Sequence, residues 1–190
     1  MTVNYKSYKD VLELAKSIDE NDYKNVDFIV VDNSEDEIEY ENLSVGLEDI
    51  FKNSNKNYSV LKNVNSGYAG GNNLGIKFAL EELNVDYIWI LNPDTVITSG
   101  SILELLRTIE FTDIPVATCK MVDYYSGACQ YDDKSVDFLG HRKDCNTQGI
   151  FRADFLGGTN ISLKKDVIER VGLFEEKYFL YFENNESLKG

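Results

Sequence analysis

Three groups of polar residues in this 190-residue chain could take part in binding a ligand or a metal. Residues 32–33 (Asp-Asn) follow the apolar run "FIVV", residues 65–75 are polar and rich in glycine, and residues 92–94 (Asn-Pro-Asp) end the run "YIWIL". Each group alone is also typical of an ordinary turn, because Asp, Asn, Gly and Pro all favour turns. Their shared position after apolar runs indicates a common site.

Asp94 is the candidate metal ligand. Pro93 lacks a backbone donor and fits poorly in a central strand, so the chain should leave the sheet there and let Asp94 project from its end. A hard cation such as Mn²⁺ or Mg²⁺ needs only one or two protein carboxylates when the phosphates of a ligand complete its coordination. Such an ion would neutralise a diphosphate leaving group. It would also offset the repulsion between that anion and an acidic protein.

The glycine-rich stretch excludes two common nucleotide-binding motifs. Its spacing, G-x-x-G-G-x-x-x-G from Gly67 to Gly75, matches neither G-x-x-x-x-G-K-[ST] nor G-x-G-x-x-G, which disfavours phosphate-loop ATPases and dinucleotide dehydrogenases. Glycines still let the backbone approach a flat or phosphorylated ligand, and the helix that follows offers its N-terminus. A plain tight turn between strand and helix remains the alternative.

A second set of carboxylates follows the aromatic run "YFLYF". Activation of an acceptor hydroxyl requires a positioned carboxylate as general base, and Glu183 or Glu186 could provide it. A solvated acidic segment is an equally good interpretation, because acidic residues are mostly exposed. His141, the single histidine, has no Ser or Cys partner signature nearby and is predicted to be a surface loop residue.

Composition excludes several classes of function. Nineteen basic and thirty-three acidic residues give a net charge of −14, which argues against nucleic acid as a partner. The three cysteines form no C-x-x-C pair, which argues against a disulfide framework or a zinc site and favours a reducing cytoplasm. No stretch approaches the roughly 18 to 20 apolar residues of a membrane span, and no signal peptide is recognised.

The elements that must position these groups alternate between strand and helix, which predicts βαβ units. We expect strands at residues 1–5, 26–31, 58–62 and 86–91, and helices at 8–19, 44–52, 72–83 and about 99–110, the last with Ser99 or Ser101 as N-cap. Beyond residue 113 we expect strands at 114–121 and near 151–162 and a helix at 164–171.

The predicted fold class is therefore α/β, a three-layer structure with a mainly parallel sheet and helices on both faces. A single domain of residues 1–190 should divide into a nucleotide-binding half, 1–112, and an acceptor-side half, 113–190. Ligands bind beyond the carboxyl ends of the strands in such sheets. The three polar groups should therefore share one rim.

In their order along the chain, five stretches resemble family 2 glycosyltransferases of the GT-A fold, especially the rhamnosyltransferase-like group that builds cell-surface polysaccharide. "VNYKSY" is similar to the opening strand, "VVDNSED" to the nucleotide-contacting segment, "NSGYAGGNNLGI" to the Asn/Gly loop, and "WILNPDT" to a variant D-x-D metal motif. The segment from Phe155 to Glu186 resembles the acceptor-side segment that ends in Glu-Asp-x-Asp.

The resemblance implies roles for individual residues. Val3 and Asn4 would lie near the nucleotide and Asp32 would contact the base. The donor pocket would be lined by Asn65, Gly71 and Asn73, Asn92 would hold the first position of the metal motif, and Asp94 would ligate the metal. The implied reaction is inverting transfer of a sugar from a UDP- or dTDP-sugar to a hydroxyl of a saccharide or lipid-linked saccharide. The implied location is the cytoplasm, with peripheral association at the inner face of the membrane.

Departures from the family pattern leave a second hypothesis open. Asn184 stands where the family has its base Asp, and an amide accepts no proton at neutral pH, so Glu183 becomes the substitute base. The family usually continues with helices beyond the position of Gly190. We therefore expect an incomplete acceptor side whose exposed apolar surface favours a homo-oligomer. The alternative is a nucleotide-sugar-binding module or an inactive relative.

A phosphatase of the haloacid dehalogenase type is a third interpretation, because "NPDTV" superficially matches D-x-D-x-[TV]. Its nucleophile would have to be Asn92. An amide is not the carboxylate nucleophile that the covalent step requires, so we set this interpretation aside.

Overall fold

A computed structural model describes residues 1–128, 135–136, 152–153 and 158–177. Strands and helices alternate up to residue 112, as predicted. The elements are β1 (Thr2–Asn4), α1 (Tyr8–Asp19), β2 (Asp27–Asp32), α2 (Glu37–Phe51), β3 (Asn57–Lys62), α3 (Gly67–Glu81), β4 (Tyr87–Leu91), α4 (Ser101–Thr112), β5 (Val116–Ala117), β6 (Ser135–Val136), β7 (Arg152–Ala153), β8 (Asn160–Lys164) and α5 (Lys165–Val171).

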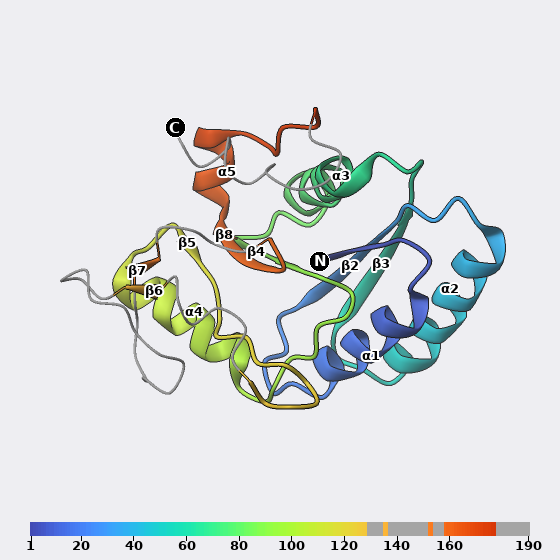
Figure 1. Ribbon diagram of the computed structural model, residues 1–190, viewed down its shortest axis with the longest axis horizontal. Coiled ribbons are helices and arrows are strands. Elements are labelled where there is room, and N and C mark those ends of the chain that lie inside the picture. Colours follow the sequence, from blue (N-terminus) through green and yellow to red (C-terminus); the bar gives the residue numbers. More distant parts are fainter. Residues whose placement is uncertain (129–134, 137–151, 154–157, 178–190) are drawn as a thin grey trace.

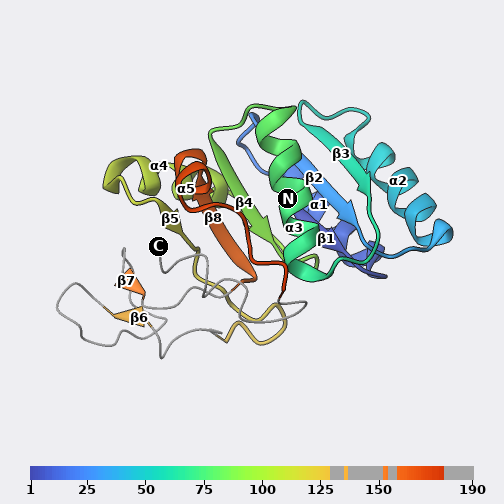
Figure 2. The same cartoon turned by 90° about the horizontal axis from the view of Figure 1, so that it is seen from above.

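Two three-stranded sheets form one continuous six-stranded sheet, because hydrogen bonds of Met1 link β1 to β4. Strands β1, β2 and β3 pair in parallel, while β8 pairs antiparallel with both β4 and β5. The Met1 nitrogen donates to the Trp89 carbonyl oxygen at 2.7 Å, and the Leu91 N–H donates to the Met1 carbonyl oxygen at 3.0 Å. This is the hydrogen-bond pattern of parallel neighbours. The strand order is therefore β3-β2-β1-β4-β8-β5 (Figure 2).

Helices cover both faces of this sheet, as Figure 1 shows. Alternate side chains of β2 enter different cores: Phe28 and Val30 pack with α1, α2 and α4, whereas Ile29 and Val31 pack with α3 and α5. The strand is buried on both sides, which explains its unbroken apolar sequence. The predicted three-layer α/β fold with a mainly parallel sheet is confirmed, with β8 as the antiparallel exception.

Two helices begin earlier than their apolar periodicity predicted. Helix α2 begins at Glu37 because the Asp36 side chain accepts hydrogen bonds from the N–H groups of Ile38 and Glu39. Helix α3 begins at Gly67, so the first turns of this helix are the glycine-rich stretch itself. The predicted Ser99 or Ser101 cap of α4 is wrong, since Gly100 holds the N-cap position with a left-handed φ of 79°.

The strands beyond residue 113 are shorter than expected. The strand predicted at 114–121 is reduced to Val116–Ala117, and the one predicted near 151–162 is instead the two separate strands β7 and β8. Strand β8 lies between β4 and β5, so it is buried and apolar at Ile161 and Leu163. The helix predicted at 164–171 is confirmed as α5.

A buried lysine closes the carboxyl end of α1. Lys56 is only 7% exposed, and its ammonium group donates to the carbonyl oxygens of Asp19 at 2.6 Å and Asn21 at 2.7 Å. Carbonyl groups at a helix end have no intrahelical partner and carry partial negative charge, so a cation satisfies them well.

We expect Lys56→Met to lower the free energy of unfolding by about 2 kcal/mol, because both carbonyl oxygens lose a charged donor while buried. Urea unfolding followed by circular dichroism measures this change. Lys52→Met is the matched control, since Lys52 is exposed and pairs with the exposed Asp49. Equal stability of the two variants would contradict the role assigned to Lys56.

Candidate functional site

Polar residues gather at the rim where the parallel strands end. Asn4 and Asp32 are the last residues of β1 and β2, and the chain turns at residues 92–95 directly after β4. The Met1 bridge makes β4 the parallel neighbour of β1, so these ends lie on the same edge of the sheet (Figure 2). The strands β2 and β4, after which Asp32 and Asp94 come, are therefore about 10 Å apart, the width of two strand spacings.

Asp32 is buried, and its carboxylate is held by two neighbouring side chains. Asn4 Nδ2 donates to Asp32 Oδ1 at 2.9 Å, and the hydroxyl of Ser34 donates to the same oxygen at 2.6 Å. The Ser34 backbone N–H adds a third bond at 3.2 Å. The resemblance placed Asn4 and Asp32 together at the nucleotide, and in the structure they are in direct contact.

The same network reaches the start of α1. Asn4 Oδ1 accepts from both the N–H and the hydroxyl of Ser7 at 3.1 Å. Glu39, on α2, accepts the N–H of Tyr8 at 2.7 Å, which places a carboxylate at the positive end of the α1 dipole. These hydrogen bonds connect β1, β2 and α2 at the rim.

Asn33 connects this rim to the first turn of α3. Its Nδ2 donates to the Gly67 carbonyl oxygen at 3.1 Å, and its Oδ1 accepts from Asn63 at 2.9 Å. Asn65 Oδ1 accepts the Gly67 N–H at 3.3 Å, and Gly67 has a left-handed φ of 73°. These contacts hold the amino end of α3 beside Asp32.

Gly71 permits the close approach of α3 to β1. A Cβ atom at Gly71 would lie 2.8 Å from Val3 Cγ1 and 3.0 Å from Asn33 Nδ2, both too close for a normal contact. The structure thus brings together Val3, Gly71 and the network of Asn4 and Asp32. Glycine is therefore needed at position 71 because a side chain there would clash with Val3 and Asn33. Its preference for turns is not the reason.

Asn73 has a different set of partners from those the resemblance implied. Its Nδ2 donates to the Phe174 carbonyl oxygen at 2.9 Å and to Glu176 at 2.7 Å, and its Oδ1 accepts the Phe174 N–H at 2.9 Å. The buried amide therefore anchors residues 174–176 to α3. In this conformation it has no N–H left for a ligand.

Asp94 is exposed in the turn that follows β4. The Thr95 N–H donates to the Asn92 carbonyl oxygen at 3.2 Å, and the Asn92 N–H donates to Thr159 at 3.0 Å, so the turn is fixed to the sheet at its start. No described residue donates a hydrogen bond to the Asp94 carboxylate or forms an ion pair with it.

This environment fits a cation that the protein holds through one carboxylate. Within the described ranges, no cluster of three or more His, Cys, Asp or Glu residues could hold a metal alone. An ion at Asp94 would therefore need a diphosphate and water to complete its coordination, as Mg²⁺ sites commonly do.

The two predicted catalytic residues, Glu183 and Asn184, lie outside the described residues, as does His141. Their roles stay predictions. Sequence reasoning missed Ser34 and Glu39. A serine two residues after an aspartate is a weak local signal of a side-chain turn. Glu39 had no such signal, because it caps α1 from another helix.

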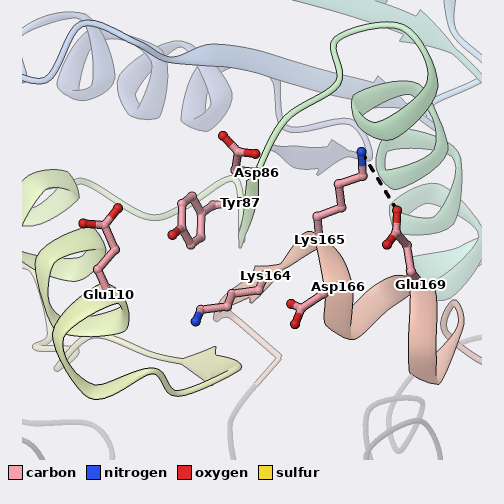
Figure 3. A pocket seen from close by; sticks show the side chains of 7 residues that line it. All are labelled: Asp86, Tyr87, Glu110, Lys164, Lys165, Asp166 and Glu169. Carbon is pink, nitrogen blue, oxygen red and sulfur yellow. Dashed lines mark ion pairs between the residues drawn. The ribbon is translucent and has the colours of Figure 1, made fainter.

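A pocket of about 380 Å³ lies at the opposite end of β4 (Figure 3). Its lysines are already engaged: Lys164 pairs with Asp113 at 2.6 Å, and Lys165 lies 3.9 Å from Glu169 and 2.9 Å from Asn84. A diphosphate would find four carboxylates there, which favours the other rim. The lining residues are Asp86, Tyr87, Glu110, Lys164, Lys165, Asp166 and Glu169.

Cys119 lies near the rim, where Asn160 Nδ2 donates to its carbonyl oxygen at 3.0 Å. Burial raises the pKa of the Cys119 thiol to about 11. At pH 8 we expect iodoacetamide to label Cys119 roughly a hundredfold more slowly than an ordinary cysteine, because thiolate is the reactive form. The rate should rise as the pH approaches 11.

Peptide mass spectrometry of the labelled chain measures this rate for Cys119 separately from Cys129 and Cys145. The control is the same chain in urea, where the thiol regains its ordinary pKa. Equal labelling of Cys119 with and without urea at pH 8 would contradict the effect of burial.

In the part of the chain that the structure describes, no helix has the length and apolarity needed to cross a bilayer.

Comparison with solved structures shows the fold. Residues 1–349 of TarS from S. aureus superpose with a TM-score of 0.68 at 16% identity, covering 98% of this chain and 52% of that one. The same TarS fragment in complex with UDP gives a TM-score of 0.69 at 18% identity, with the same coverage. These neighbours are GT-A glycosyltransferases, so the GT-A fold is confirmed.

Comparison of sequences shows the family. The low-salt glycan biosynthesis hexosyltransferase Agl10 of Haloferax volcanii is 28% identical over 193 residues, covering 97% of this chain and 58% of that protein. The chain thus spans little more than half the length of this relative. Residues 1–172 match the family model described as Glycosyl transferase family 2. Because that match covers nearly the whole described chain, the protein belongs to glycosyl transferase family 2.

Proposed function

We propose that this chain binds a nucleoside diphosphate sugar and transfers its sugar, with inversion, to an acceptor hydroxyl in cell-surface polysaccharide synthesis. The donor is a UDP- or dTDP-sugar, and the acceptor is a saccharide or a lipid-linked saccharide. The TarS fragment that resembles this chain in fold was solved with UDP. We place the reaction in the cytoplasm, at the inner face of the membrane.

The observation that supports this proposal best is the pair of carboxylates on one rim. Asp32 is buried and held by Asn4 and Ser34, whereas Asp94 is exposed and has no hydrogen-bond or ion-pair partner for its carboxylate among the described residues. A nucleoside diphosphate is long enough to reach from the base at Asp32 to the diphosphate at Asp94. In this proposal Val3, Asn65 and Gly71 line the donor pocket; Val3 packs against Gly71, and Asn65 accepts the Gly67 N–H where α3 begins.

Asp94 is the proposed ligand of Mn²⁺ or Mg²⁺, with Asn92 beside it in the same turn. Such an ion, when bound, neutralises the diphosphate leaving group. The chain's own contribution is to orient the donor. Asp32 binds the base, the α3 amino end faces the phosphates, and Asn92 and Asp94 set the position of the diphosphate.

The acceptor side belongs to residues 113–190 in this proposal. Glu183 takes the proton of the acceptor hydroxyl as the oxygen attacks the anomeric carbon, and the diphosphate departs from the opposite face. Asn184 occupies the neighbouring position of the family motif. Asn73 supports this half by anchoring residues 174–176 to the nucleotide-binding half.

Calorimetry with UDP and Mn²⁺, together with an assay of UDP-sugar hydrolysis, tests the proposal. We expect binding and slow release of sugar to water. Binding without release would favour the alternative, a nucleotide-sugar-binding module, which Asn184 at the family's base position supports. Absence of UDP and dTDP binding in the presence of Mn²⁺ would overturn both.

A further inference from the structure

We propose that Tyr124 and Tyr125 bind a sugar ring of the acceptor by stacking the apolar face of that ring on an aromatic face. We call these two residues the tyrosine platform. The inference rests on the proposed function, because it takes the acceptor to bind at the rim that holds the donor. It assigns the platform to a neutral saccharide and not to a lipid surface.

Both rings of the tyrosine platform are open to solvent. Tyr124 is 67% exposed and Tyr125 is 93% exposed, and their ring centroids lie 5.3 Å apart with an interplanar angle of 84°. Aromatic side chains this exposed bury little apolar area, so they contribute little to the stability of the fold. Two of them side by side form a surface on which a ligand can bury apolar area.

Short-range hydrogen bonds hold the loop that carries the platform. Asp123 Oδ1 accepts from the N–H of Ser126 at 2.8 Å and from its hydroxyl at 2.7 Å. The Asp123 N–H donates to the Ala128 carbonyl oxygen at 2.7 Å, and the Gly127 N–H donates to the Asp123 carbonyl oxygen at 2.8 Å. The backbone of the platform is therefore ordered before a ligand arrives, which reduces the entropy lost on binding.

The loop follows a segment that lies beside the turn of Asp94. Strands β4 and β5 both pair antiparallel with β8, so the chain leaves β5 at the edge where β4 ends (Figure 2). Thr159 contacts both segments: its carbonyl oxygen accepts the Asn92 N–H at 3.0 Å, and its hydroxyl donates to the Met121 sulfur at 3.2 Å. Tyr124 comes three residues after Met121, a span of at most about 11 Å. An acceptor bound at the turn can therefore reach the platform.

A sugar ring matches the tyrosine platform in shape and polarity. One face of a pyranose presents C–H groups, which pack on the electron-rich face of an aromatic ring. The hydroxyl groups at the edge of the sugar can exchange hydrogen bonds with the phenolic oxygens, which both donate and accept. Because the two rings are nearly perpendicular, one can stack on the sugar while the other flanks it.

The charges around the platform disfavour an anionic partner. The chain has a net charge of −14, and Asp123 stands directly before the two tyrosines. Hydrogen bonds from Ser126 lower the pKa of Asp123, so this carboxylate is charged at neutral pH. Anionic lipid surfaces attract clusters of basic residues, whereas residues 118–128 contain a single one, Lys120. A neutral saccharide meets no such repulsion.

An acceptor bound in this way carries a sugar before the reaction begins. The chain therefore extends a glycan, and an earlier glycosyl transfer must supply the acceptor. A lipid attached to the far end of that glycan adds nothing to the contact with the tyrosine platform.

NMR titration of the isotope-labelled 190-residue chain with trisaccharides tests the inference. The probes are cellotriose, maltotriose, mannotriose and tri-N-acetylchitotriose, each added in the presence of UDP and Mg²⁺. We expect at least one of them to shift the amide signals of residues 122–128. Tyr125→Ala should weaken that binding about tenfold, because an aromatic stacking contact is lost. Tyr125→Phe keeps the ring and should retain most of the affinity.

Phe111→Ala is the matched control for loss of an exposed aromatic ring. Phe111 is 88% exposed and follows Glu110, which lines the pocket at the opposite end of β4. This variant should bind the trisaccharides as tightly as the unaltered chain. The amide spectrum shows directly whether each variant is folded, and Tyr124→Ala is the second variant of the platform.

The outcomes separate the inference from the proposed function. If no trisaccharide bound to a chain that still binds UDP, the inference would be overturned and the proposed function would stand. Equal affinities of Tyr124→Ala, Tyr125→Ala and the unaltered chain would have the same meaning. Absence of UDP binding would overturn the proposed function, and the acceptor role of the platform with it.

The same trisaccharides with an undecyl chain at the reducing end separate sugar recognition from lipid recognition. We expect Tyr125→Ala to weaken binding of the free and the lipid-bearing forms by the same factor. The inference would be wrong if only the lipid-bearing forms bound. It would also be wrong if Tyr125→Ala abolished sedimentation with phosphatidylglycerol vesicles and left trisaccharide binding unchanged, since the platform would then be a membrane contact.

Discussion

Asp94→Ala is expected to weaken UDP binding in the presence of Mn²⁺ by at least about 100-fold, since metal clamping of a diphosphate contributes several kcal/mol. The turn at residues 92–95 has no other free carboxylate, and the Asp94 side chain has no protein partner among the described residues. The substitution should therefore remove the carboxylate that binds the ion while leaving the fold intact.

Calorimetry with and without EDTA separates the metal effect from a general loss of affinity. In EDTA, the unaltered chain and Asp94→Ala should bind UDP equally weakly. Asp86→Ala is the matched control, because Asp86 is also exposed and lies just before the other end of β4. If Asp94→Ala kept the full Mn²⁺-dependent affinity, the metal site proposed here would be wrong.

Gly71→Ala is expected to be less stable than Gly75→Ala by about 2 kcal/mol, because overpacking a rigid contact costs this much. At Gly71 the new methyl meets Val3, a β-branched residue in a strand, and Asn33, which is held by Gly67 and Asn63. At Gly75 it meets mainly the end of the Met1 side chain, which can move aside.

Both glycines lie in α3, so the gain in helix propensity from Gly to Ala is the same and cancels in the comparison. Urea unfolding gives the stability difference, and calorimetry gives the UDP affinity. We expect roughly tenfold weaker UDP binding for Gly71→Ala alone, because displacement of Asn33 shifts the rim beside Asp32. Identical behaviour of the two variants would contradict the close contact of α3 with β1.

The site was partly predictable from local sequence. Asp32 and Asp94 follow apolar strands, and the carboxyl ends of parallel strands meet at one edge, so their shared rim follows from pattern and topology. The hydrogen bond between Asn4 and Asp32 could not be predicted from local sequence, because Asn4 lies 28 residues away along the chain. The hydrogen bonds of Asn73 with residues 174–176 could not be predicted either, since about 100 residues separate them in the chain.

By itself, the sequence determined the identity and order of the elements as far as residue 112. Helix α1 at residues 8–19 was predicted with its observed bounds, because its apolar face is encoded locally, although Glu39 and Lys56, which satisfy its two ends, lie elsewhere in the chain. Strand β2 was recognised because burial on both faces leaves a continuous apolar run.

Only the tertiary structure decided how Met1 joins two halves of the sheet, how closely α3 approaches β1, and which residue satisfies the amino end of α1. Each of these depends on hydrogen bonds or close packing between residues distant in sequence, such as Glu39 with Tyr8 or Gly71 with Val3. Periodicity reports which face of an element is buried. It does not indicate which residues pack against that face, and in this protein such distant residues include the hydrogen-bond partners at the site.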